Sequence, residues 1–176
     1  MSQVPPSKPA VFGFLSIEHV PDLGYCGGYL LLNPLGRPIE FHCTAPVREN
    51  RAQQILYGET YESFIYCEQI GKALLDKAGQ SADIIFVNDH RFGELEVAGD
   101  IPVVEVGSDS RPGRSVNAEQ VQQRIQVGSQ TLVWLGPVVD RERVSSACQS
   151  LAKSIPLDEP FERISQAIDE AQAVVR

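Results

Sequence analysis

The fold is decided by residues 29–43, which read YLLLNPLGRPIEFHC. Two apolar stretches flank Asn33-Pro34-Leu35-Gly36, where proline presets φ for a turn and glycine can take the positive φ of a bulge. The first stretch, residues 29–32, is apolar on both faces, which predicts a central strand. The second stretch alternates apolar with polar side chains, which predicts one buried face formed by Ile39, Phe41 and Cys43.

Working outward, residues 10–20 are rich in apolar and β-branched side chains and end at Pro21-Asp22, which predicts a first strand and a three-strand antiparallel meander. Helical periodicity follows, with Thr60 as a cap and Gly79 as a terminator of the longer helix. Two helices, residues 48–56 and 60–78, are therefore expected. Later segments alternate: strands at 83–87, 94–97, 102–106 and 131–135, a loop at 107–115, and helices at 115–126, 140–153 and 161–175.

This order predicts the α/β class, with a mixed sheet that begins with the meander and continues with alternating helices and strands. Over residues 10–153 it resembles the ribonuclease-H-like or actin-like class of mixed sheets, and other three-layer α/β arrangements fit as well. Three prolines in residues 1–10 predict a disordered tail. We expect residues 11–176 to form a single domain.

Charge and composition bound the partners and the compartment. Fifteen Lys and Arg against 23 Asp and Glu give a net charge of −8, which repels phosphate backbones, so nucleic acid is an unlikely partner. No apolar run approaches the roughly 20 residues that cross a bilayer, and the first residues lack the apolar centre of a secretory signal. Four scattered cysteines without a Cys-x-x-Cys pair indicate reduced thiols and a cytoplasmic protein.

Polar residues follow the buried strand at 83–87, where open α/β sheets tend to bind ligands. They form the strongest candidate binding site: Asn88, Asp89, His90 and Arg91. A hydrogen-bonded turn is the simpler interpretation of the same residues. A second polar cluster contains Arg111 and Arg114, which could bind an anionic group or an acidic segment of a partner, although a solvated loop again suffices.

A two-metal hydrolase of the ribonuclease-H-like class needs several carboxylates at strand ends, because paired Mg²⁺ or Mn²⁺ ions must be neutralised. The candidates here are Glu18, Glu40 and Asp89. The resemblance implies an aspartate on the first strand, where this chain has Glu18 followed by His19. Ordinary structural roles for these carboxylates are the favoured interpretation.

Thiolate chemistry is a third hypothesis. A zinc site could use only Cys26, His42, Cys43 and Cys67, and Cys26 beside Gly27 and Gly28 is the best candidate nucleophile. His42 and Cys43 are adjacent and point to opposite faces of a regular strand, so buried core thiols are the preferred interpretation.

The sequence contains no complete catalytic or nucleotide-binding motif. Its leading interpretation is a non-catalytic cytoplasmic binding or assembly subunit without a cofactor, which acts through protein–protein contacts with a partner or a second copy. The alternative is a metal-dependent hydrolase or phosphoryl-transfer enzyme of ribonuclease-H-like topology.

Overall fold

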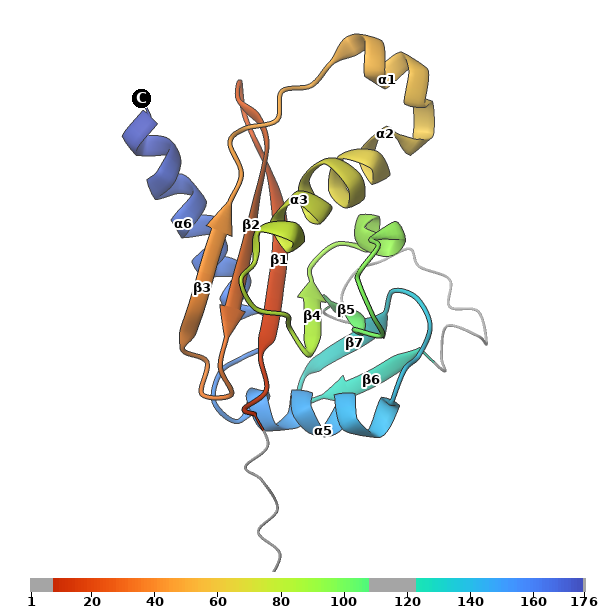
Figure 1. The fold of residues 1–176 in the computed structure, drawn as a ribbon, viewed down its shortest axis with the longest axis vertical. Coiled ribbons are helices and arrows are strands. Elements are labelled where there is room, and N and C mark those ends of the chain that lie inside the picture. The colour runs from red at the N-terminus through yellow and green to blue at the C-terminus, as the bar shows by residue number, and fades with distance from the viewer. Residues whose placement is uncertain (1–7, 108–122, 176) are drawn as a thin grey trace, which may run out of the picture.

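The computed structural model describes residues 8–107 and 123–175, which build one seven-stranded mixed sheet with the order β3-β2-β1-β4-β5-β7-β6 (Figure 1). Buried apolar clusters on both faces of the sheet pack against helices, so the structure confirms the predicted α/β class and its three-layer arrangement. The strands are β1 Phe12–Val20, β2 Gly24–Leu32, β3 Pro38–Cys43, β4 Ile84–Val87, β5 Val103–Gly107, β6 Arg124–Val127 and β7 Gln130–Trp134.

The first three strands form the predicted antiparallel meander. In its second turn, Asn33 Oδ1 accepts hydrogen bonds from the backbone N–H groups of Leu35 and Arg37, both at 3.0 Å, and Gly36 has a φ of 72°. β2 is buried along its whole length, whereas β3 is the edge of the sheet. Ile39 and Phe41 remain 36% and 37% exposed, so the prediction that they are buried is wrong, because helix packing is concentrated on the inner strands.

β4 returns beside β1 in parallel, with Leu15 opposite Val87, after the helical crossover that leaves β3. β5 is parallel to β4, and β7 is antiparallel to β5. The β6–β7 hairpin completes the other edge. The parallel centre therefore places the carboxyl end of β4 beside the middle of β1, which continues from Leu15 to Val20.

One face of the sheet is covered by the crossover. It contains α1 Arg51–Tyr57, the 3₁₀ turn η1 Gly58–Thr60, α2 Tyr61–Ser63, the π-helical segment η2 Phe64–Gly71 and α3 Lys72–Lys77. We call this the α3 face. The Thr60 hydroxyl donates to the carbonyl of Tyr57 instead of capping a backbone N–H, and Gly79 does not have a positive φ, so both predicted helix-end signals are wrong.

The other face is covered by α5 Arg141–Ala152 and α6 Glu159–Val175, and we call it the α6 face. Asp140 caps α5 as predicted, since its Oδ1 accepts from the backbone N–H of Arg143 at 3.3 Å. α6 packs on β1 and β2, behind the sheet in the view of Figure 1. Phe161 of α6 packs edge-on against Phe14 of β1, and Phe14 stacks on Phe86 of β4.

Two further expectations need correction. The strand predicted at 94–97 is absent: the 3₁₀ helix η3 His90–Glu94 and irregular chain occupy this stretch. Of the helix predicted at 115–126, only residues 123–126 are described, and three of these belong to β6.

Residues 1–7 of the predicted tail, together with Arg111 and Arg114, lie outside the described residues. No helix in the described part of the chain is long and apolar enough to cross a membrane.

Candidate functional site

A polar pair joins the middle of β1 to the carboxyl end of β4, with Ser16 buried and Asn88 half-buried. Asn88, the first residue after β4, donates from Nδ2 to the Ser16 hydroxyl oxygen on β1 at 3.0 Å. Ser16 is 1% exposed. Phe14 lies two residues before Ser16 and Phe86 two residues before Asn88, and their rings stack with centroids 4.8 Å apart in the core of the α6 face. Because side chains alternate along a strand, the Ser16–Asn88 pair lies on the same face.

Sequence reasoning named Asn88 but missed Ser16. The available signal was that Ser16 is the one polar residue in the apolar run from residue 11 to residue 17. Serine in such a run is also compatible with an isolated backbone-bonded hydroxyl, so the sequence alone does not reveal its partner. The two residues lie 72 positions apart and meet only because β1 and β4 are neighbours.

Glu18 lies two residues beyond Ser16 and therefore on the same α6 face. It pairs across the sheet with Cys26, which is fully buried. Burial, with smaller contributions from Cys43 and Glu18, raises the pKa of the Cys26 thiol. Among the candidate carboxylates, Glu18 is the one beside the Ser16–Asn88 pair.

Asp89 points to the opposite side and serves as an anchor for Arg91. Its Oδ1 accepts from Arg91 N at 2.9 Å and Nε at 3.0 Å, and its Oδ2 accepts from Nη2 at 2.7 Å. Burial acts to raise the pKa of Asp89, but the hydrogen bonds and charge of Arg91 outweigh it and lower that pKa overall. Arg91 also contacts Glu62 at 3.2 Å and lies 4.2 Å from the centroid of the Tyr66 ring.

The polar group predicted after β4 is therefore divided between two faces. Asn88 turns to Ser16, whereas Asp89 and Arg91 form an ion pair above η2. His90 is exposed, with Nδ1 3.5 Å from Asp89 Oδ1. The prediction of a hydrogen-bonded turn describes Asp89, because its carboxylate caps η3 through the Arg91 N–H.

Glu40 lies on the edge strand and closes the loop that follows α3. Its Oε2 accepts from His42 Nε2 at 3.0 Å and from the backbone N–H of Gly79 at 2.9 Å. These two hydrogen bonds lower the pKa of Glu40. The opposite residue on β2, Leu31, belongs to the core of the α3 face. Glu18 and Glu40 therefore project from opposite faces, and the structure does not bring the three predicted carboxylates together.

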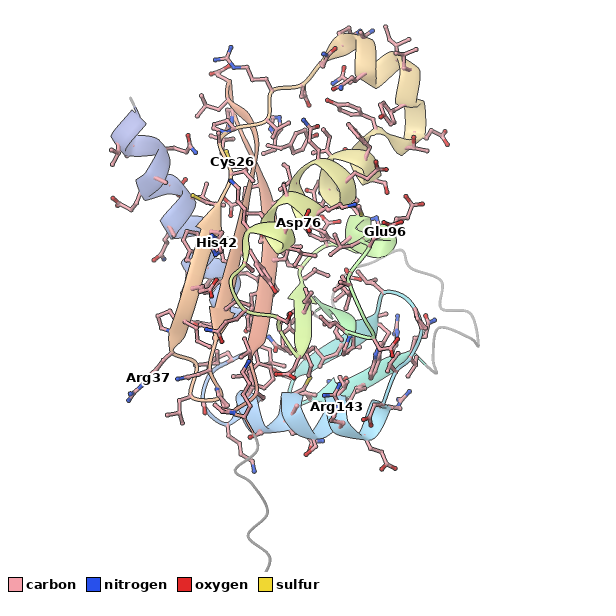
Figure 2. The ribbon with its side chains drawn as sticks, in the orientation of Figure 1. Cys26, Arg37, His42, Asp76, Glu96 and Arg143 are labelled. Carbon is pink, nitrogen blue, oxygen red and sulfur yellow. The ribbon has the colours of Figure 1, made fainter. Side chains whose placement is uncertain are left out.

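The residues predicted for thiol or zinc chemistry are divided between the two faces: Cys26 and Cys43 both pack on the α6 face, whereas His42 and Cys67 lie on the α3 face. Figure 2 labels Cys26 on β2 and His42 on β3; Cys26 belongs to the core of the α6 face, whereas His42 is paired with Tyr29 of the α3 face. Cys67 donates from Sγ to the carbonyl of Arg91 at 3.2 Å, and burial raises its pKa. All four cysteines are free of disulfides.

The side chains that meet where β4 ends beside β1, Ser16 and Asn88, do not fit the Mg²⁺ or Mn²⁺ expected for a hydrolase. These hard cations take oxygen ligands whose charge neutralises them, usually carboxylates. Ser16 and Asn88 are neutral, and the hydroxyl oxygen already accepts a hydrogen bond. Within residues 8–107 and 123–175, no group of three or more His, Cys, Asp or Glu side chains could hold a metal ion.

An exposed apolar patch lies on α1, at the end of the sheet toward which β1 and β4 run (Figure 1). None of the residues of α1 is buried, and Ile55 and Leu56 are 67% and 83% exposed. Tyr57 stacks on Phe64 with ring centroids 4.2 Å apart. We call Ile55, Leu56 and Tyr57 the α1 patch. Sequence reasoning placed Ile55 and Leu56, but not Tyr57, in a helix, and did not recognise that this helix projects from the body.

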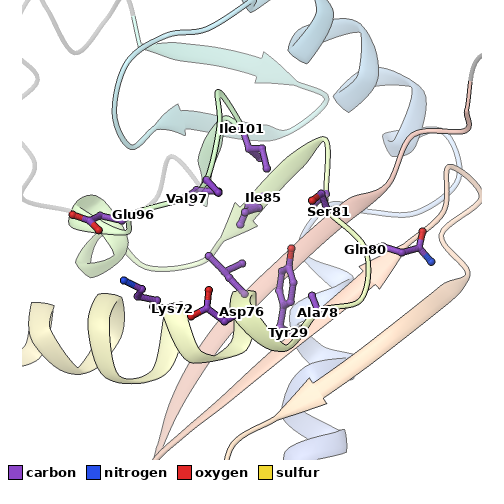
Figure 3. Close-up of a pocket in the computed structure, with 13 residues that line it drawn as sticks. Tyr29, Lys72, Asp76, Ala78, Gln80, Ser81, Ile85, Glu96, Val97 and Ile101 are labelled. Carbon is purple, nitrogen blue, oxygen red and sulfur yellow. The ribbon is translucent and has the colours of Figure 1, made fainter.

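A separate cavity of about 360 Å³ lies beside the amino end of β4, between α3 and the chain that precedes β5 (Figure 3). Tyr29 reaches into it from β2, and the phenol is 1% exposed, so burial raises its pKa. Leu75, Ile85 and Ile101 supply apolar walls. This cavity is at the opposite end of β4 from Asn88 and does not contribute to the site described above.

No protein-family model and no curated protein matches the chain, so its class comes from the fold. The fold is that of the ribonuclease-H-like mixed sheets in the form seen in Endonuclease V. The catalytic domain of human Endonuclease V is 14% identical, with a TM-score of 0.58 over 95% of this chain and 85% of that chain.

Two complexes from Ciona intestinalis share the fold. An Endonuclease V variant bound to a 23mer DNA that contains an inosine followed by a ribo-adenosine is 11% identical, with a TM-score of 0.59 over 97% of this chain and 88% of that chain. Endonuclease V bound to a 24mer DNA of the same description is 10% identical, with a TM-score of 0.52 over 94% of this chain and 88% of that chain.

These structures overturn two expectations from the sequence. The interpretation as a non-catalytic subunit acting through protein–protein contacts is wrong, because the similar structures are nucleases and favour the hydrolase alternative. The expectation that nucleic acid is an unlikely partner is also wrong, because this fold holds DNA in the Ciona complexes. The net charge of −8 is a sum over the whole chain, and recognition depends on the surface that meets the strand.

Proposed function

We propose that this chain is a nucleic-acid-acting protein of the nuclease-like class, which takes a polynucleotide at the end of the sheet toward which β1 and β4 run. The observation that carries the proposal is the similarity of nearly the whole chain to Endonuclease V, including structures with bound DNA. No step is assigned to Mg²⁺ or Mn²⁺, because the Ser16–Asn88 pair does not fit either ion.

The α1 patch supports this proposal. Proteins that distort nucleic acids insert apolar side chains between base steps, and aromatic side chains provide stacking surfaces for bases. Ile55 and Leu56 are exposed on α1, none of whose residues is buried, and Tyr57 follows them at the end of the same helix. Arg48 and Arg51 are exposed at the start of the same segment and supply positive charge for phosphates.

The test is binding of a fluorescently labelled 23mer DNA that contains an inosine followed by a ribo-adenosine, measured by anisotropy. We expect binding that weakens steeply between about 50 and 200 mM salt, because phosphate contacts release counterions. The double variant Ile55→Ser/Leu56→Ser should bind roughly tenfold more weakly through loss of the apolar contacts.

The matched control is Leu35→Ser, which removes a 63% exposed leucine from the β2–β3 turn at the opposite end of the sheet. Its affinity should equal that of the parent. The proposal is wrong if the parent does not bind the oligonucleotide, or if the control loses as much affinity as the α1 variant.

We also propose a reducing, cytoplasmic setting for this activity. It is supported by four cysteines that form no disulfide, three of which are buried.

A further inference from the structure

The place where β4 ends beside β1, at which a ribonuclease-H-like hydrolase should carry cation-binding carboxylates, carries a neutral pair instead. Ser16 on β1 and Asn88 after β4 occupy adjacent positions on neighbouring parallel strands and bond to each other at 3.0 Å. Carboxylates at two such positions would face one ion from both strands. In this chain the Asn88 amide donates to the Ser16 hydroxyl oxygen, and both side chains are neutral.

We infer that the chain has the Ser16–Asn88 hydrogen bond in place of a divalent-cation site. We also infer that it contacts nucleic acid at this end of the sheet without a bridging ion. The second half of this inference rests on the proposed function. The first half concerns only the chemistry of the strand ends and stands independently of any nucleic acid.

Packing around Ser16 supports the inference. The residue opposite Ser16 on β2 is Gly28, and a Cβ added there would lie 2.4 Å from Ile164 Cγ2 of α6. α6 therefore sits directly on the sheet beside the serine. Ser16 is 1% exposed beside this closely packed helix, so its hydroxyl is shielded from water and has the half-buried Asn88 amide as its donor.

Electrostatics point the same way. Of the three candidate carboxylates, all of which lie in the described part of the chain, only Glu18 is on this face, and a single carboxylate leaves a divalent ion largely uncompensated. Replacing Ser16 and Asn88 by aspartates would place three carboxylates at one strand edge. Their mutual repulsion and partial burial would destabilise the fold until a cation neutralised them.

The experiment measures Mn²⁺ binding by calorimetry and thermal unfolding with and without MnCl₂, for the parent, Asn88→Asp and Ser16→Asp/Asn88→Asp. The parent should show no binding heat and a Tm that Mn²⁺ shifts by less than ~1 °C. The double variant should have a lower Tm than the parent, and Mn²⁺ at about 100 times its Kd should raise that Tm by roughly 5–10 °C.

The single variant Asn88→Asp keeps the test decisive if the double variant does not fold, since it is isosteric and should bind Mn²⁺ measurably where the parent does not. The matched control, Ser129→Asp/Ser150→Asp, adds the same two charges at exposed positions and should gain no Mn²⁺-dependent stability. Mn²⁺ binding by the parent that Asn88→Ala abolishes would overturn the inference. So would folded aspartate variants that gain no affinity for Mn²⁺.

A second measurement addresses nucleic acid. The affinity of the parent for the inosine-containing 23mer should agree within about twofold between EDTA and MnCl₂. An affinity about tenfold higher in MnCl₂ would contradict contact without a bridging ion. If the oligonucleotide does not bind in either buffer, the proposed function fails, while the Mn²⁺ titrations still decide whether the cation site has been replaced.

Discussion

At the residue scale, the polar side chains around β4 show how one short stretch serves two faces. Asn88 completes the Ser16 pair on the α6 face, and the next residue, Asp89, holds Arg91 on the α3 face. The period-two alternation of strand side chains explains the division, because consecutive residues leave a strand in opposite directions. A cluster that is compact in sequence is thus dispersed in space.

The Asp89–Arg91 ion pair makes folding stability depend on pH. The pKa of Asp89 is lowered in the folded protein, so its contribution is fully present above the unfolded value of about 3.9 and is lost as pH falls through the folded value. Asp89→Asn should cost about 2 kcal/mol at pH 7, because charge-assisted hydrogen bonds are lost. Urea unfolding at a series of pH values should show the difference from the parent shrinking toward acid.

Asp169→Asn on the exposed surface of α6 is the matched control for this prediction and should be as stable as the parent at pH 7. A constant difference between parent and Asp89→Asn across the whole acid range would show that the carboxylate charge is not the cause.

At the element scale, the position of α6 depends on a glycine in the strand beneath it. Gly28 allows Ile164 to approach the sheet so closely that an added Cβ would lie 2.4 Å from Ile164 Cγ2. Ile168 is also within ordinary contact of that point, at 3.4 Å. Gly28→Ala should therefore push the helix outward and disturb the buried core on this face, even though alanine suits a strand no worse than glycine.

We predict that Gly28→Ala lowers the free energy of unfolding by about 1–3 kcal/mol through overpacking. Ile164→Ala alone should cost about 2–5 kcal/mol because it leaves a cavity. The double variant should cost less than the sum of the two, because the alanine methyl then occupies space vacated by the isoleucine. Denaturant unfolding of the four proteins measures this coupling, and strict additivity would contradict the proposed contact.

The crossover between β3 and β4 contains an irregular helical element, the π-helical segment η2. A Cβ on Gly71 would lie 2.5 Å from the carbonyl oxygen of Tyr66, so glycine at this position permits the wider turn. The segment places Tyr66 against Phe92 and under Arg91. π-helical turns frequently occur at functional sites, and this one places Tyr66 beside the Asp89–Arg91 ion pair.

At the scale of the whole molecule, one sheet separates two apolar cores. The α6-face core contains Trp134, the single tryptophan of the chain, and the α3-face core contains Tyr29, Tyr61 and Tyr66. β1, β2, β4 and β5 contribute side chains to both cores. Neither core can lose its packing without exposing the strands that support the other.

We predict that the two cores unfold together, in keeping with the single domain expected for residues 11–176. Urea transitions followed by tryptophan fluorescence, which reports the α6 face, and by far-ultraviolet circular dichroism should coincide. Transitions with clearly different midpoints would show that the two cores are separate cooperative units.

Much of the fold was predictable because its signals are local. The turn at Asn33 to Gly36 is held by hydrogen bonds within five residues, and the Asp140 cap acts within its own helix. Edge effects were not predictable from pattern alone: β3 alternates as a half-buried strand should, yet its position at the sheet edge leaves Phe41 exposed. Strand order, not alternation, determines how much of a face is covered.

The candidate site was predictable only in part. The polar residues after β4 were located correctly from the sequence, but the carboxylates chosen as possible metal ligands, Glu18, Glu40 and Asp89, point to different faces or different ends of the sheet. By itself, the sequence determined the α/β class, the meander and most helices and strands, because neighbouring residues set those. Only the tertiary structure decided that Ser16 meets Asn88, because the parallel pairing of β1 with β4 joins residues 72 positions apart through packing that no local pattern encodes.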